Sequence, residues 1–263
     1  MLYVADCLAG VTQLHSVVYV VCANSSTISR FSTTTRQLLT DINVKDLKDP
    51  LDIAACGHTS QLYIADWVGC IWRVSSDGED IKCWLPKSPS DTLKPWTLSV
   101  TSARLLVSSH ESSQLTQFDA SGDELWHIRL SDYMKPRHAV ESVTGTFIVS
   151  HQNRLPDQGQ VSEVNTEGQV LRQFSSVLSW PRHIAVDSQG NIFVADSDNS
   201  RILLLDAQLT PRLVIIDVRQ LKNKQPWRLH YMEQSGQLLV GFHGGVAVFD
   251  VLQRWAVGQT LQD

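Results

Sequence analysis

The chain has 263 residues, of which 43% are hydrophobic and 19% are charged, and its formal net charge is −5. This composition is typical of a globular protein and excludes a globally basic nucleic-acid-binding domain. No apolar run approaches the about 20 residues of a membrane-spanning helix, and MLYVADCLAG lacks the charged and apolar regions of a signal peptide. We expect a soluble, monomeric, cytoplasmic domain without a membrane partner. The strand-like run directly after Met1 suggests that it belongs to a larger multidomain chain.

A strand-rich unit recurs along the chain. Its first copy begins near Cys7 with CLAGVTQLHSVVYVVC and lacks the proline that opens the later copies. Those later copies begin at Pro50, Pro95, Pro136, Pro181 and Pro226. Successive copies start 41–45 residues apart, so six units of about 44 residues account for nearly the whole chain.

Each unit contains four short runs with the composition of β-strands. In the copy from Pro50 they lie at 52–56, 61–66, 70–74 and 81–85, and in the copy from Pro181 at 183–187, 191–196, 201–206 and 212–217. β-Branched and aromatic residues fill these runs, and Gly, Asn, Ser or Asp separates them. Four antiparallel strands in each of six units predict an all-β, six-bladed β-propeller over residues 1–263, with blades starting near 7, 50, 95, 136, 181 and 226.

A closed ring explains why the inner strands are apolar throughout, because each sheet packs both of its faces against neighbouring sheets. Closure requires a fourth strand for the last blade, and either LYVAD at 2–6 or RWAVGQ at 254–259 supplies suitable residues. Because LYVAD stands where the outermost strand of a preceding blade belongs, we predict closure by this N-terminal strand. QTLQD at the end of the chain is then a tail.

The segment from Pro181 to Ile202, PRHIAVDSQGNIFVADSDNSRI, resembles an NHL repeat nearly in full. The copy at Pro50 matches well, and the others match mainly by their period. The resemblance implies a six-bladed propeller, often the C-terminal module of a larger protein such as a TRIM-type ubiquitin ligase, that binds protein or RNA. We expect the repeat residues Asp196 and Arg201 to bond each other and nearby loop amides, in a structural role.

Functional residues are expected where the blades differ, on the face at which the innermost strands begin and the second strands end. Directly after the proline the repeats place Leu51, Trp96, Arg137, Arg182 and Trp227. The next position holds Asp52, Thr97, His138, His183 and Arg228, and the loops after the second strand add Trp67, His110, His151, Asp198 and His243. From these we predict ten partner-binding residues: Asp52, Trp67, Trp96, Arg137, His138, Arg182, His183, Asp198, Trp227 and Arg228.

Aromatic and arginine side chains are enriched in interaction hot spots, so we predict a non-catalytic scaffold that presents this face to a protein or peptide partner, without a cofactor. Single-stranded RNA is the alternative, because basic and stacking residues suit it. A metal-dependent hydrolase or lyase is the second alternative, since five of the nine histidines map to this face. In amidating lyases of similar fold, zinc-binding histidines directly follow the proline. No histidine occupies that position here, so we predict no metal ligands and no catalytic residues.

The five cysteines all lie in the first third of the chain, without the C-x-x-C spacing of a zinc site. This pattern predicts reduced, buried thiols in an intracellular protein. Cys70 and Cys83 are predicted on neighbouring strands on either side of SSDGE, so a disulfide between them is the alternative.

Overall fold

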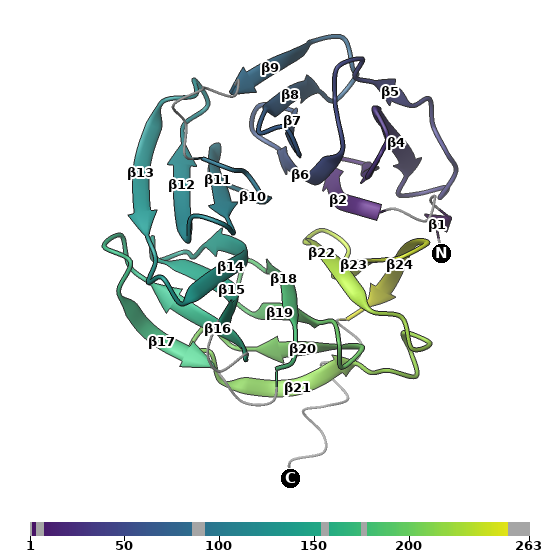
Figure 1. Ribbon diagram of the computed structural model, residues 1–263. Helices are drawn as coiled ribbons and strands as arrows, with labels where there is room; N and C mark the ends of the chain where they lie inside the picture. Colours follow the sequence, from purple (N-terminus) through teal and green to yellow (C-terminus); the bar gives the residue numbers. More distant parts are fainter. Residues whose placement is uncertain (1, 4–7, 86–92, 154–157, 175–177, 252–263) are drawn as a thin grey trace.

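In the computed structural model, six four-stranded antiparallel sheets stand around a central channel (Figure 1). The structure describes residues 2–3, 8–85, 93–153, 158–174 and 178–251. These residues contain no helix long and apolar enough to cross a membrane. The prediction of an all-β, six-bladed propeller is confirmed.

The first three blades follow one another in chain order, each with its strands in sequence order from the channel outwards. Blade 1 consists of β2 (Leu8–Leu14), β3 (Val17–Cys22), β4 (Thr27–Ser32) and β5 (Ile42–Asn43). Blade 2 consists of β6 (Pro50–Cys56), β7 (Gln61–Asp66), β8 (Ile71–Ser75) and β9 (Ile81–Leu85). Blade 3 consists of β10 (Thr97–Thr101), β11 (Arg104–Ser109), β12 (Gln114–Phe118) and β13 (Glu124–Arg129).

The last three blades repeat this order, except that the sixth takes its outermost strand from the start of the chain. Blade 4 consists of β14 (Met134–Glu141), β15 (Phe147–Asn153), β16 (Gly159–Val164) and β17 (Val170–Phe174). Blade 5 consists of β18 (Pro181–Val186), β19 (Ile192–Asp196), β20 (Arg201–Leu205) and β21 (Pro211–Ile216). Blade 6 consists of β22 (Pro226–Met232), β23 (Gln237–Phe242), β24 (Gly245–Asp250) and β1 (Leu2–Tyr3).

The ends of the ring meet at blades 6 and 1. The innermost strands β22 and β2 are in contact, as are all other neighbouring innermost strands. Leu2 pairs with Val246 and Tyr3 with Gly245, which joins β1 to β24. Residues 4–7, which would connect β1 to β2, and the competing run 254–259 lie outside the described residues. Closure by the N-terminal strand therefore stays a prediction.

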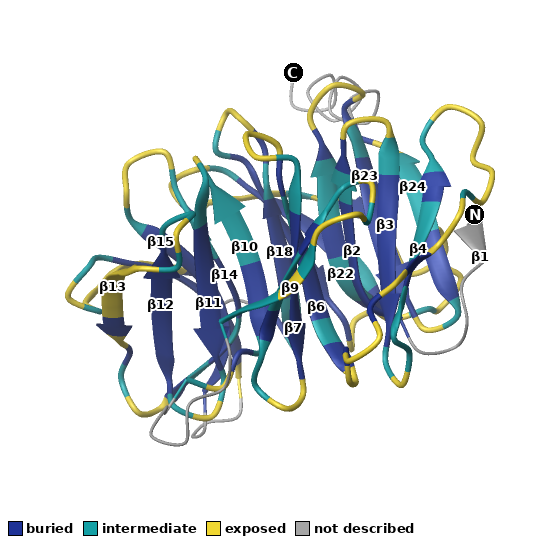
Figure 2. Cartoon of the chain, turned by 90° about the horizontal axis from the view of Figure 1, so that it is seen from above, coloured by how far each residue is buried: buried dark blue, intermediate teal, exposed yellow. Residues whose placement is uncertain are grey.

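Burial follows each strand's place in its blade. The second strands β7, β11, β15, β19 and β23 are buried along nearly their whole length, whereas the outermost strands β13 and β17 are mostly exposed (Figure 2). Packing between neighbouring sheets removes both faces of a second strand from water, and this explains the uninterrupted apolar runs in the sequence. The core is accordingly divided into clusters between successive blades.

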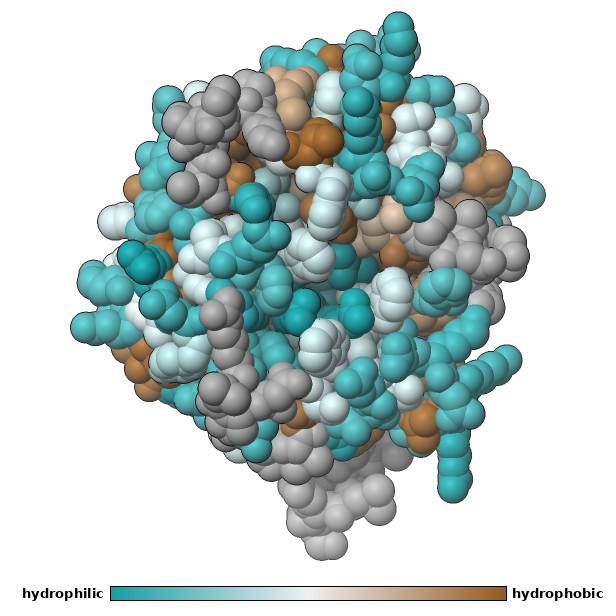
Figure 3. Space-filling view, viewed as in Figure 1, coloured by the Kyte–Doolittle hydropathy of each residue, from teal (hydrophilic) through white to brown (hydrophobic). Residues whose placement is uncertain are grey.

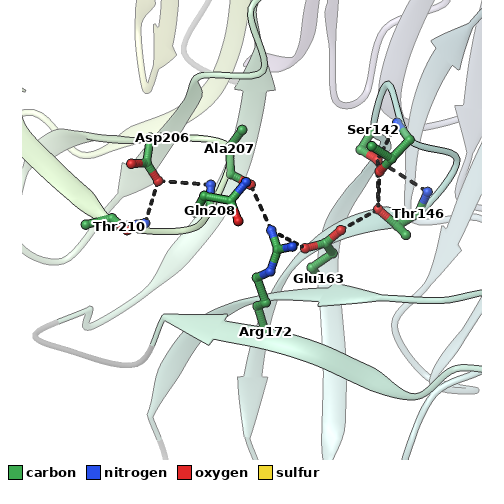
Figure 4. Close-up of polar contacts among 9 residues, drawn as sticks. Ser142, Thr146, Glu163, Arg172, Asp206, Ala207, Gln208 and Thr210 are labelled. Atoms are coloured by element: carbon green, nitrogen blue, oxygen red, sulfur yellow. Dashed lines mark hydrogen bonds and ion pairs between the residues drawn. The ribbon is translucent and has the colours of Figure 1, made fainter.

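A polar seam links blades 4 and 5 at their outer part (Figure 4). The carboxylate of Glu163 on β16 accepts a hydrogen bond from Thr146 Oγ1 at 2.7 Å and forms an ion pair with Arg172 on β17 at 3.3 Å. Arg172 also donates to the carbonyl of Ala207, in the turn between β20 and β21, at 3.5 Å. The guanidinium therefore connects two blades while it neutralises a carboxylate that is 6% exposed.

The thiols of Cys56, Cys70 and Cys83 are free, and Cys7 lies outside the described residues. Cys70 and Cys83 are neighbours, as predicted, but they are not joined in a disulfide. Burial, followed by the adjacent Cys70, raises the pKa of Cys83 to about 12. Because the thiolate is the reactive form of cysteine, this thiol is unreactive at neutral pH.

His151 differs from its expected position. The sequence predicted it in an exposed loop, but β15 extends to Asn153 and the imidazole is only 1% exposed. Nδ1 donates to the Asn153 side-chain oxygen at 3.1 Å, and Nε2 accepts from the Ser162 hydroxyl at 2.9 Å. Burial lowers the pKa of His151 from 6.5 to about 4. His151 is therefore a neutral, structural histidine.

We expect the free energy of unfolding to fall as the pH drops from 6.5 towards 4. In this window the unfolded chain protonates position 151 but the folded chain does not, so His151 contributes a slope of about 1.4 kcal/mol per pH unit. Urea unfolding at about pH 7.5 and about pH 5 measures it. His151→Gln should show a smaller loss between the two values, and an unchanged loss would contradict this role.

Candidate partner-binding face

The innermost strands share a local distortion at the face where they begin. Directly after the leading proline, β6, β14, β18 and β22 shift register against their neighbours, as a β-bulge does. The extra residues of these bulges are Leu51, Arg137, Arg182 and Trp227, and all four are partly buried. A bulge leaves its extra residue outside the regular ladder and redirects its side chain. A position that differs among the blades therefore stands outside the regular ladder where the central channel opens, which we call the channel mouth.

The next residues along these strands form the floor of the mouth. Arg228 of blade 6 and Asp52 of blade 2 form an ion pair with a Nε–Oδ1 distance of 3.2 Å, and their side chains are 13% and 2% exposed. Arg228 Nη2 also donates to the carbonyl oxygen of Leu51 at 2.8 Å. These contacts join blade 6 to blade 2 across blade 1.

Blade 1 permits this connection because its residue at the corresponding position is a glycine. A Cβ atom on Gly10 would lie 2.7 Å from the backbone nitrogen of Ile53 and 3.0 Å from Asp52 Oδ1. The missing side chain leaves the space in which Asp52 meets Arg228. The sequence does not indicate that Gly10 has this role, because the first repeat is the one that matches the others least.

Asp52 is a buried, fully engaged carboxylate. Its Oδ2 accepts the backbone N–H of Leu98 in the neighbouring blade at 2.9 Å. Burial raises the pKa of Asp52, while Arg228 and this hydrogen bond oppose the shift. The Arg228 guanidinium and the Leu98 amide provide the partners that a buried carboxylate requires.

His138 and His183 stack beside Asp52, with ring centroids 3.6 Å apart. His138 Nε2 donates to the Leu98 carbonyl at 3.3 Å, and His183 Nδ1 accepts the backbone N–H of Leu229 at 3.4 Å. Burial lowers the pKa of both rings well below the ordinary value, so both are neutral. Below them the channel holds a cavity of about 180 Å³.

The exposure expected for three predicted site residues is thus corrected. Asp52, His138 and His183 are 1%, 2% and 6% exposed. They tie neighbouring innermost strands together beneath the face, because the bulge turns the preceding residue outwards and this one into the channel. They lie beneath the side chains that the sequence predicts to bind a partner.

The same three residues are the one group among the described residues whose ligand atoms approach closely enough to hold a metal ion, all within 4.8 Å of one another. Their bonds fit a metal poorly. Asp52 already forms an ion pair with Arg228, and a divalent ion would add uncompensated positive charge to a buried site. His183 Nε2 holds its proton because Nδ1 is the acceptor nitrogen, and His138 Nε2 donates to Leu98, so only His138 Nδ1 of the two rings keeps an unpaired ligand atom.

Above the floor, arginine and tryptophan side chains alternate. The Arg137 guanidinium lies 4.4 Å from the Trp180 ring centroid. The Arg182 guanidinium lies 5.8 Å from Trp180 and 4.7 Å from Trp227. We call these four residues the Arg–Trp stack. Figure 3 shows hydrophilic side chains gathered around the centre of the disc on the face that it presents.

Trp180 is a member of this stack that sequence reasoning missed. It stands directly before Pro181, in the strongest repeat, and its backbone is fixed by the repeat aspartate. Asp196 Oδ1 accepts the N–H of Ser179 at 3.0 Å, and its Oδ2 bonds Arg201 Nε at 2.8 Å. The predicted structural role of Asp196 and Arg201 is confirmed. The hydrogen bonds of Asp196 also hold Trp180 in its position between two arginines.

A side cavity of about 230 Å³ adjoins the stack between blades 2 and 3. Trp67, which is 64% exposed, and Trp96 both line it. The Trp96 ring contacts His110 at a centroid distance of 5.6 Å, and His110 Nδ1 donates to the Pro136 carbonyl at 3.2 Å. Leu51 lines the same cavity, and its carbonyl oxygen accepts a hydrogen bond from Arg228 of the floor.

The remaining predicted residues lie at the rim. Asp198 is exposed and accepts a hydrogen bond from the Ser179 hydroxyl at 3.3 Å. His243 is exposed and lies edge-on to Trp227, with centroids 6.1 Å apart. The structure therefore divides the ten predicted residues among a buried floor, a stack, a side cavity and a rim.

Comparison with protein families supports the repeat assignment. The profile of the NHL repeat matches residues 178–203, the segment that contains Trp180 and the Asp196–Arg201 pair. The fold defines the class of protein, a six-bladed β-propeller. Within that class, the segment of residues 178–203 in this chain is an NHL repeat. A comparison with curated proteins gives no match.

Solved structures of diverse proteins share the fold. A hydrazine synthase chain from Kuenenia stuttgartiensis is 10% identical with a TM-score of 0.67, covering 94% of this chain and 96% of that chain. A chain of a nidogen/laminin complex is 15% identical with a TM-score of 0.66, covering 82% of each. A catalytically inactive virginiamycin B lyase from Staphylococcus aureus with quinupristin is 11% identical with a TM-score of 0.67, covering 92% of this chain and 78% of that chain. At these identities the similarity shows the fold alone.

Gly10→Ala should destabilise the protein by about 1–3 kcal/mol, because the added methyl group overlaps backbone and the Asp52 carboxylate. Urea unfolding measures the change. Gly57→Ala is the matched control, since no atom lies within 4 Å of a Cβ there. Equal effects at the two positions would show that space at Gly10 is not limiting.

We expect the Asp52, His138 and His183 group to bind no stoichiometric zinc, because Asp52 is paired with Arg228 and only His138 Nδ1 of the two rings keeps an unpaired ligand atom. Elemental analysis of purified protein and calorimetric titration with zinc measure this. Zinc that binds at one equivalent in the wild type and is lost in His138→Gln would contradict the expectation and favour a metal-dependent hydrolase or lyase.

Proposed function

We propose that this chain is a non-catalytic binding module that presents the channel mouth to a protein or peptide partner. The observation that carries the proposal is the Arg–Trp stack of Arg137, Trp180, Arg182 and Trp227. Arginine and tryptophan are the residues most enriched in interaction hot spots. Here they lie together over a floor fixed by buried bonds.

Rigidity supports this role. The stack stands on bulges anchored in the innermost strands, and the floor beneath links blades 2, 3, 5 and 6 through Asp52, His183 and Arg228. Side chains held in this way lose little conformational freedom when a partner binds, which preserves affinity. The nidogen/laminin complex is a precedent for a propeller of this fold in a protein assembly.

A non-catalytic role agrees with the state of the titratable groups at the mouth. Asp52 is bonded to Arg228 and Leu98, and the neighbouring histidines are neutral and bonded to backbone. A general acid or base must reach a substrate proton, and these groups lie beneath the surface. We further propose a cytoplasmic location, which the free thiols of Cys56, Cys70 and Cys83 support.

Single-stranded RNA is the second candidate. Its support is the same stack, because nucleobases stack on tryptophan and phosphates bind arginine. Such binding depends steeply on salt, so a titration with mixed-sequence single-stranded RNA at low salt measures it. Absence of binding at low salt would exclude this candidate.

We expect the Arg137→Ala/Arg182→Ala double variant to lose the partners that the wild-type domain captures from a lysate of its source organism. The control is Arg36→Ala/Arg212→Ala, two exposed arginines away from the mouth, on the β4–β5 turn and on the outermost strand β21. Calorimetry with the purified partner should then show binding at least about tenfold weaker for the mouth variant only, as expected for hot-spot residues. Equal affinity for wild type and mouth variant would place the interface elsewhere.

A further inference from the structure

Among the described residues, the channel mouth holds more positive than negative charge. Arg137, Arg182 and Arg228 lie together there, and Asp52, the carboxylate in the floor, is bonded to Arg228. Arg182 has no ion pair at contact distance among the described residues. Its Nε atom is buried without a hydrogen-bond partner, and so are the indole nitrogens of Trp180 and Trp227. The mouth thus has donors in excess of acceptors.

The stacking geometry determines what Arg182 can bind. Trp180 and Trp227 lie within 5.8 Å and 4.7 Å of its guanidinium and cover it by cation–π contact. A guanidinium covered on its faces keeps the N–H donors in its plane, and two parallel donors match the two oxygens of a carboxylate. Arg228 differs, because it donates to the carbonyls of Leu51 and Trp227 as well as pairing with Asp52.

Electrostatics favours an added negative charge at Arg182. Burial, and then the neighbouring Arg228, lower the pKa of Arg182, while the exposed Asp198 opposes the shift only in part. An anion between the guanidiniums would offset their mutual repulsion. The apolar surroundings of the two indoles would strengthen that attraction relative to water.

We propose that the mouth recognises the carboxylate of an Asp or Glu side chain in a peptide partner, with Arg182 as the principal donor and Arg137 beside it. A neighbouring apolar side chain of the same peptide enters the cavity lined by Trp67, Trp96 and Leu51. This inference rests on the proposed function and specifies its partner. Leu51 connects the two subsites, because it borders the cavity and accepts the hydrogen bond from Arg228.

The distribution of charge favours a peptide over RNA. A nucleic acid requires basic groups along a track that follows successive phosphates. Among the described residues, the arginines of this face lie at its centre, and the lysines near them are already bonded, Lys94 to Glu111 and Lys135 to the Glu111 carbonyl and the Ser113 hydroxyl. Glu111 borders the side cavity, where it forms an ion pair with Lys94, and Asp198 is exposed at the rim. A single carboxylate needs contact only with the central arginines, so it does not have to lie beside these acidic groups.

The test measures binding of the whole chain to an array of short degenerate peptides, each with one position fixed as a chosen amino acid. We expect the strongest signals with Asp or Glu fixed, and about tenfold or greater loss with Asn or Gln, as for hydrogen bonds to charged groups. Amidated C-termini should leave these signals unchanged. Mixed-sequence single-stranded RNA serves as the competing probe.

Matched variants locate the site. Arg182→Gln should lose the preference for Asp and Glu, and Arg182→Lys should retain the charge but bind weaker than wild type, because a lysine lacks the planar fork. Arg36→Gln, on the β4–β5 turn, should bind as the wild type does. Urea unfolding of each variant shows whether the fold is intact, and the peptide change from Asp to Asn tests the carboxylate in unaltered protein.

Three outcomes would overturn the proposal: no preference for Asp or Glu, a preference that requires a free C-terminus, or RNA bound more tightly than any peptide. An unchanged preference in folded Arg182→Gln would do the same. Failure here is distinguishable from failure of the proposed function. If the mouth variant loses its captured partner but Asp and Asn peptides bind alike, the face binds a partner through other chemistry.

Discussion

The buried ion pair between Arg228 and Asp52 is the contact on which the channel mouth depends. It spans from blade 6 to blade 2 and closes the floor over blade 1, where Gly10 leaves the space. Loss of one member of such a pair costs about 3–5 kcal/mol, because the other charge stays buried without a partner. The pair adds little net stability, but it fixes the positions of the strands that it joins. With Asp52 also bonded to Leu98, it fixes where three innermost strands begin.

One backbone feature serves two purposes. The β-bulge after the leading proline turns one residue outwards and the next into the channel. In blade 5 the outward residue is Arg182, in the Arg–Trp stack, and the inward residue is His183, in the floor. Scaffold and candidate site therefore alternate along the strand. Variation at the outward position changes the face without altering the bonds that hold the ring.

The two proposals rest on different observations of the same Arg–Trp stack. The binding role follows from the side chains that lie together at the mouth, and the carboxylate preference follows from the donor excess around Arg182. The side cavity contributes apolar surface through Trp67 and Trp96, which the arginines lack. A partner that uses both would gain specificity from charge and affinity from buried apolar surface.

The sequence by itself determined the fold, because strands and turns are encoded locally and the period of the repeat counts the blades. It also determined which repeat positions reach the mouth, including Arg137, Arg182 and Trp227. It did not determine that Asp52, His138 and His183 are buried, since the bulge depends on pairing between strands. His151 was misplaced because β15 is longer than the repeat suggests. Only the tertiary structure decided that Trp180 lies between two arginines, or that Gly10 makes room for the contact between Asp52 and Arg228, which are far apart in the sequence. The physical reason is that ring closure brings together residues from the two ends of the chain, and no local pattern records such contacts.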